Sequence, residues 1–200
     1  MVDKINRFVR HVPVWAVWVL YLLPVPVLLY MGMTGGLGRE PIKALEHELG
    51  EIALQLLIIG LSITPLRRYL GVNLLKFRRA FGLLAFTYVA LHLLVWAVLD
   101  VQIIGQMWAD IVKRPYITIG MAALLVMVPL AITSNNRSVR RLGPKWRQLH
   151  KLTYIAVILG GVHFLMVRRG FQLEPIIYLI VIFGLLALRI PRKRLMSSLS

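Results

Sequence analysis

Two histidines lie deep inside long apolar runs, where an ionisable side chain is costly and marks a functional position by default. His92 follows Arg79 by 13 residues, and His163 follows Lys151 by 12 residues. Both imidazoles therefore reach a similar depth from the same side of a membrane. Two neutral imidazoles at one level on facing helices are what axial ligation of a haem iron requires. The spacing therefore predicts that His92 and His163 bind one haem between them.

His150 is a further candidate ligand, at the inner edge of the run that contains His163. The two residues are 13 positions apart, which corresponds to about 20 Å of helical rise. That spacing would suit a second haem near the opposite membrane face. Arg78 and Arg79 occupy the position where its second ligand would be expected, so the sequence allows one haem or two.

Other readings of these histidines stay open. A membrane histidine also serves as an interhelical hydrogen-bond donor, or as a proton relay in a small transporter. His47 precedes the second apolar run, and His11 stands beside the N-terminal basic cluster, where an interfacial role is preferred. The chain has no Cys, which excludes iron–sulfur clusters and covalently attached c-type haem. Phosphate-binding, zinc-binding and hydrolase motifs are absent from the sequence as well.

The elements that hold these residues are predicted to be transmembrane helices. The chain is 58% hydrophobic with a mean hydropathy of +0.74, more apolar surface than a soluble domain of this length can hide. We therefore expect an all-α integral membrane protein, a six-helix bundle forming a single domain over residues 1–200. Pro65 is expected to end the second helix, and Pro24, Pro26 and Pro129 to kink others. The six apolar stretches lie near 14–33, 46–65, 80–99, 116–133, 152–167 and 174–190.

The charges predict the orientation of the bundle. Most of the 24 Lys and Arg residues lie at the two ends of the chain and in alternate loops. By the positive-inside rule, both termini are then cytoplasmic. Most of the eight acidic residues fall on the opposite side, where they would attract a basic protein partner or simply solvate short loops. The basic residues do not form one soluble face, so nucleic acid is not an expected partner.

Four segments of the sequence resemble a known family. The resemblance to the MsrQ (YedZ) family, within the wider ferric-reductase-like transmembrane group, covers nearly the whole chain. It rests on EHELGEIALQLLIIGLSITPLRRYLG (46–71), RRAFGLLAFTYVALHLLVW (78–96), RPYITIG (114–120) and RSVRRLGPKWRQLHKLTYIAVILGGVHF (137–164).

The resemblance implies a haem b protein of the bacterial inner membrane that transfers electrons without reducing the final substrate itself. Its donor would be the quinone pool or a cytoplasmic flavin reductase. Its acceptor would be MsrP, a periplasmic molybdopterin enzyme that reduces methionine sulfoxide in oxidised envelope proteins. FMN is also implied, with no residue of this sequence assigned to it. His92, His150 and His163 match the family's candidate haem ligands.

The sequence departs from the wider ferric-reductase pattern at one position. That pattern has a second histidine on the third helix, which this sequence lacks, so the haem number and the axial partner of His150 stay open. A ferric or quinone reductase that acts without a partner is a separate alternative. Because the chain contains no nucleotide-binding motif, oxidation of NAD(P)H by this chain alone is not expected.

Overall fold

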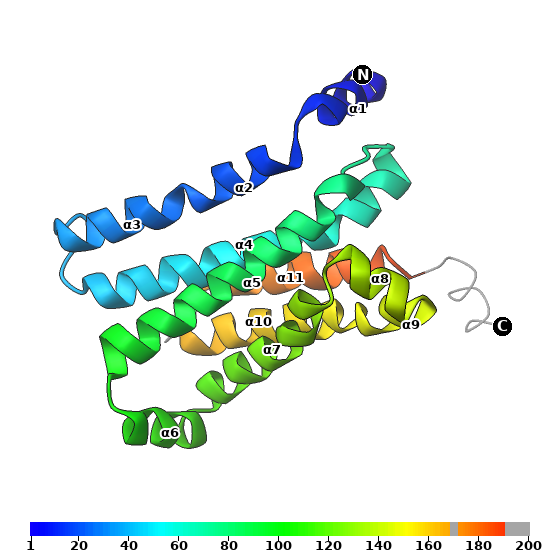
Figure 1. Ribbon diagram of the computed structural model, residues 1–200. Coiled ribbons are helices and arrows are strands. Elements are labelled where there is room, and N and C mark those ends of the chain that lie inside the picture. Colours follow the sequence, from blue (N-terminus) through cyan, green and yellow to red (C-terminus); the bar gives the residue numbers. More distant parts are fainter. Residues whose placement is uncertain (169–171, 191–200) are drawn as a thin grey trace.

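Helices form every regular element in residues 1–168 and 172–190, the part of the chain that the computed structural model describes (Figure 1). In chain order they are α1 (Val2–His11), α2 (Val14–Leu22), α3 (Pro24–Met33), α4 (Pro41–Leu70), the 3-10 turn η1 (Leu75–Phe77), α5 (Arg78–Val95), the π-helical segment η2 (Trp96–Val101), α6 (Ile104–Lys113), α7 (Pro115–Ile132), α8 (Asn136–Leu142), α9 (Pro144–Leu149), α10 (Leu152–Val167) and α11 (Leu173–Ala187).

The long helices follow the predicted apolar stretches closely. Five segments are long and apolar enough to cross a membrane, namely α2–α3, α4, η1 to η2, α7, and α9 to α10. The sixth predicted stretch is the apolar helix α11, which has 15 residues and is shorter than the other five. The protein is therefore a multi-pass, all-helical membrane protein in the part of the chain described.

Prolines divide the first span into two helices, as the sequence predicts. The break between α2 and α3 falls at Leu23, because Pro24 and Pro26 each lack the N–H that would continue the helical hydrogen bonding. The hydroxyl of Tyr88 on α5 donates to the carbonyl of Tyr21, just before the break, at 2.5 Å. Tyr88 is fully buried, so this hydrogen bond ties the first span to the core.

Pro65 does not end the second span, contrary to the sequence expectation, because α4 continues to Leu70 and stops at left-handed Gly71. A proline inside a helix cannot donate to the carbonyl four residues before it, here that of Leu61. The Arg189 guanidinium supplies the missing donors: its Nη2 lies 2.6 Å and its Nε 3.2 Å from the Leu61 oxygen. This hydrogen bonding lets α4 pass through the proline.

Apolar side chains fill the core and also cover the outside of the bundle. In the described residues every buried side chain of the core is hydrophobic, with Leu56, Leu84 and Ile182 fully enclosed. Large apolar side chains also point outward from the spans, as do Leu125 and Ile180 at 66% exposure each. Such a surface is stable only against lipid.

The two ends of the bundle differ in charge. We call the end that carries α1, η1, α8 and α9 the basic end, and the end that carries the α3–α4 loop, η2 and α6 the acidic end (Figure 1). Asn6 of α1 donates to the carbonyl of Gly71, and Tyr69 donates to that of Leu188. The start of the chain and the end of α11 therefore lie together at the basic end.

Candidate functional site

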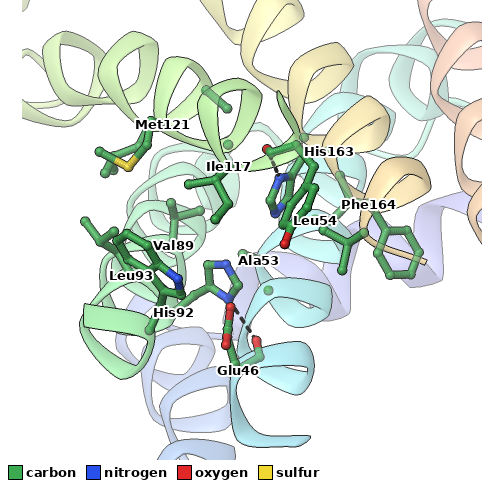
Figure 2. A pocket seen from close by; sticks show the side chains of 18 of the residues that line it. Glu46, Ala53, Leu54, Val89, His92, Leu93, Ile117, Met121, His163 and Phe164 are labelled. Carbon is green, nitrogen blue, oxygen red and sulfur yellow. Dashed lines mark hydrogen bonds between the residues drawn. The ribbon is translucent and has the colours of Figure 1, made fainter. Parts of the chain in front are cut away.

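A cavity of about 650 Å³ lies between α4, α5, α7 and α10 (Figure 2). Its lining reaches Trp96 and Asp100 of η2, at the acidic end. Its deeper walls are apolar and include Leu54, Val89 and Met121. The charged and polar lining residues come largely from the acidic end: Lys43, Glu46, His47, Glu51, Asp100 and Arg114. The cavity thus combines an apolar interior with a polar mouth.

His92 of α5 and His163 of α10 both line this cavity, and their rings lie toward one another in Figure 2. The ring centroids are 6.1 Å apart and the ring planes are nearly perpendicular, at 82°. The sequence predicted that these two imidazoles share one depth, and the structure brings them into one cavity.

Backbone carbonyls fix the orientation of both imidazoles. The Nδ1 of His92 lies 2.8 Å from the carbonyl oxygen of Glu46, and the Nδ1 of His163 lies 2.7 Å from that of Tyr116. A carbonyl oxygen only accepts, so Nδ1 carries the proton in each ring. The Nε2 of each neutral imidazole is then left with a free lone pair, which is the usual arrangement of a metal-ligating histidine.

Two glycines make room for these hydrogen bonds. Gly50 lies four residues after Glu46, and Gly120 lies four residues after Tyr116, so each is one helical turn from the acceptor carbonyl. A Cβ on Gly50 would lie 3.1 Å from Nδ1 of His92, and a Cβ on Gly120 would lie 2.9 Å from Nδ1 of His163. The same arrangement, a glycine four residues after the acceptor carbonyl, therefore accommodates both histidine rings.

Other small residues near the histidines differ in what they face. Gly160 does line the cavity, but Gly161 faces α11, where an added Cβ would meet Leu179 and Ile182 at 2.8 Å. Gly82 lines a different cavity. Gly50 and Gly120 were missed because they lie on α4 and α7, and nothing in the sequence relates those helices to the two histidines.

The residues of the cavity fit a haem. A bond between a metal and an imidazole nitrogen is about 2 Å long, so the centroids of two imidazoles on opposite sides of one metal lie roughly 6 Å apart. The observed separation of 6.1 Å matches this value. The cavity volume lies within the roughly 300–1,000 Å³ of typical cofactor sites. Its apolar walls suit a macrocycle, and Lys43 and Arg114 at the mouth suit carboxylate substituents.

His150, the third candidate ligand, lies in a separate cavity at the basic end. Its ring stacks on Trp146 at a centroid distance of 3.8 Å, and its Nε2 lies 3.0 Å from the hydroxyl of Thr133. Among the described residues that line this second cavity there is no other histidine. The structure therefore does not bring His150 together with His92 and His163.

The two remaining histidines differ from each other. His47 is exposed and lines the mouth of the first cavity, so it lies near the imidazole pair without joining it. His11 is exposed in α1, where its Nδ1 lies 2.8 Å from the carbonyl oxygen of Arg7. The hydrogen bond is local to α1, and the interfacial role of His11 stays a prediction.

The fold and the site together define a multi-pass helical membrane protein with two imidazoles in one cavity between the helices. The family model described as "Ferric reductase like transmembrane component" matches residues 15–161. No solved structure matches the chain.

Curated relatives give a closer assignment. A protein of Agrobacterium fabrum is 46% identical over 185 residues, which cover 92% of this chain and 86% of the relative. A protein of Brucella ovis is 47% identical over 182 residues, which cover 89% and 83% of the two chains. Both are named "Protein-methionine-sulfoxide reductase heme-binding subunit MsrQ". The chain therefore belongs to the MsrQ family of ferric-reductase-like transmembrane proteins.

Proposed function

We propose that this protein is the haem b electron-transfer subunit of a methionine sulfoxide reductase system in the bacterial inner membrane. It accepts electrons from the quinone pool or a flavin donor and delivers them to a periplasmic molybdopterin subunit, MsrP. That partner, and not this chain, reduces methionine sulfoxide in envelope proteins. The names of the relatives support both the haem and the reductase partner.

The imidazole pair is the observation that carries the proposal. His92 and His163 would hold one haem through Nε2, because each Nδ1 atom is bonded to a backbone carbonyl. A bound haem would supply one-electron transfer there. With two histidines bound to it, the metal would have no open site for a substrate, so the site suits electron relay. Lys43 and Arg114 at the mouth would bind the haem propionates.

Charge distribution supports the proposed direction of transfer. Under the positive-inside rule the basic end faces the cytoplasm and the acidic end faces the periplasm. Both ends of the described chain lie at the basic end, which requires an even number of crossings and supports α11 as a sixth span. The first cavity has its polar mouth at the acidic end, on the side where MsrP would dock.

Optical spectroscopy of purified variants tests the ligand assignment. We expect His92→Ala and His163→Ala each to lose the low-spin b-type spectrum, because one axial ligand is removed in each. His11→Ala is the matched control, since that exposed ring makes only a local hydrogen bond. Retention of the wild-type spectrum in both cavity variants would exclude the proposed ligand pair.

Two further measurements separate the rival functions. A transporter that uses the histidines as proton relays predicts a colourless protein after expression with added haem precursor, whereas haem ligation predicts a red one. A reductase that acts alone predicts reduction of ferric chelates or quinones at a rate that MsrP does not change. The proposed subunit is instead expected to be reoxidised by purified MsrP with methionine sulfoxide present.

A further inference from the structure

Helix α6 connects two membrane spans at the acidic end of the bundle (Figure 1). The span that ends at Val101 precedes it, and the span that begins at Pro115 follows it. A segment between two consecutive spans lies at a membrane surface, because both of its ends are fixed there. The ten residues of α6 are therefore held where lipid headgroups meet water.

One face of α6 is apolar and exposed. Ile104, Trp108 and Val112 are 82%, 69% and 67% exposed. They follow one another at intervals of four residues, so they cover an arc of about 80° on the helix. Gln106 and Lys113 are also exposed, and they lie on the other side, about 160° and 140° from Trp108. The helix thus presents both an apolar and a polar face to its surroundings, which is the pattern of a helix that lies in a lipid interface.

Contacts with the bundle fix which way the apolar face points. Met107 and Ile111 are half-buried, so the side of α6 that they form is turned toward the protein. The Thr118 hydroxyl of α7 donates to the Ile111 carbonyl at 2.5 Å, which holds α6 in this rotation. No described residue of the chain covers the apolar face, as the exposure of its three side chains shows.

Lipid is the occupant that the surroundings of this face favour. Val98, Leu99 and Ile103 lie just before α6 and are exposed as well, so the apolar face continues the lipid-facing surface of the span from η1 to η2. Within α6, Asp110 and Lys113 cancel in charge, so the helix has no net charge with which to attract a charged protein. A tryptophan at the end of a span is also typical of the membrane interface.

We propose that α6 is an interfacial helix that inserts Ile104, Trp108 and Val112 into the lipid at the acidic end and thereby holds the mouth of the first cavity. Arg114 is the C-cap of α6 and lines that cavity. Asp110, one turn earlier, pairs with it, with Oδ1 3.2 Å from Nε. A helix anchored in lipid fixes the backbone that carries both residues, so Arg114 stays at the mouth. The insertion of α6 is independent of the proposed haem, whereas the effect on the mouth rests on it.

Spin labelling tests the insertion directly, because the chain has no native cysteine. Trp108→Cys and Val112→Cys place a nitroxide on the apolar face, and Gln106→Cys and Lys113→Cys place it on the polar face as matched controls. The full chain is reconstituted in phosphatidylcholine nanodiscs, and collisions of the label with oxygen, which dissolves in lipid, are compared with collisions with a water-soluble nickel chelate. The ratio of oxygen to nickel collisions is expected to be several-fold higher at positions 108 and 112 than at positions 106 and 113.

Two results would overturn the insertion. One is an equal collision ratio at all four positions. The other is a high nickel accessibility at positions 108 and 112 that falls only when purified MsrP is added, which would show that the face binds that protein and not lipid. Labelled variants must elute from size exclusion as wild type does, and Ile104→Cys replaces Trp108→Cys if the latter does not fold.

Transfer of haem to apomyoglobin tests the effect on the mouth. Trp108→Gln/Val112→Gln makes the apolar face polar and is expected to speed haem loss in nanodiscs several-fold. Leu29→Gln/Met33→Gln is the matched control, because it makes the same change at exposed apolar positions of α3, outside the cavity lining. Equal rates in the two double variants would show that α6 does not hold the mouth. A wild-type protein that binds no haem would refute the haem proposal and this second effect with it, and the labelling result would still decide the insertion.

Discussion

The hydrogen bonding around Pro65 makes a quantitative prediction about stability. Arg189→Ala removes the donors that satisfy the Leu61 carbonyl, which Pro65 leaves without its helical partner. An unsatisfied buried polar group costs about 1–3 kcal/mol, and a hydrogen bond from a charged donor is worth more than a neutral one. We therefore expect Arg189→Ala to lower the free energy of unfolding by about 2–3 kcal/mol.

The same reasoning predicts a rescue. Pro65→Ala restores a backbone N–H at position 65, which can donate to the Leu61 carbonyl along the helix. In that background Arg189 is no longer needed at this carbonyl, so Arg189→Ala should cost about 1–2 kcal/mol less than it does in wild type. The remaining cost reflects the contact with Tyr154, whose hydroxyl accepts from Nη1 at 3.0 Å.

Reversible unfolding in mixed micelles measures this coupling, with wild type, both single variants and the double variant compared at one detergent composition. Tyr154→Phe is the control that removes the other acceptor of Arg189 and leaves the Leu61 carbonyl satisfied. If Arg189→Ala costs the same in wild type and in the Pro65→Ala background, Arg189 does not replace the missing helical bond and the reasoning fails.

Three further predictions concern single residues. Gly120→Ala places a Cβ 2.9 Å from the His163 ring, so we expect weaker haem retention and an altered low-spin spectrum. Gly82→Ala is the control, because nothing lies within 4 Å of its added Cβ, and it should leave the spectrum unchanged. Gly161→Ala places a Cβ 2.8 Å from two α11 side chains and should lower the free energy of unfolding by about 1–3 kcal/mol while the spectrum stays that of wild type. Tyr88→Phe removes the hydroxyl that donates to the half-buried carbonyl of Tyr21 in α2 and should cost about 1–2 kcal/mol in the same unfolding assay. A loss below the error of the measurement would show that the carbonyl finds another partner.

Much of the helical framework was predictable, because span length and apolar content follow from the thickness of the bilayer. The expected stretches 116–133 and 152–167 differ from α7 and α10 by one residue at most. The shared depth of His92 and His163 was also predictable, since the rise per residue fixes how far each lies from the nearest basic cluster.

Features that depend on contacts between distant segments were not predictable. The sequence indicates that Pro65 ends a helix. The helix α4 continues because Arg189, 124 positions later in the chain, donates to the Leu61 carbonyl. Gly50 and Gly120 lie in apolar helices among several other glycines, and their role appears only when the neighbouring ring is placed. The short helices α6 and α8 were missed because ten and seven residues give too little periodicity.

The acceptors that orient the two imidazoles belong to the main chain, and this has a consequence for how the site tolerates genetic change. A side chain at position 46 or 116 can be replaced without removing the carbonyl that receives the Nδ1 proton, and no change of pH alters the charge of that carbonyl. A saturation mutagenesis library should therefore be permissive at those two positions. Substitutions should instead be poorly tolerated four residues later, at positions 50 and 120, where any side chain competes with the histidine ring for space.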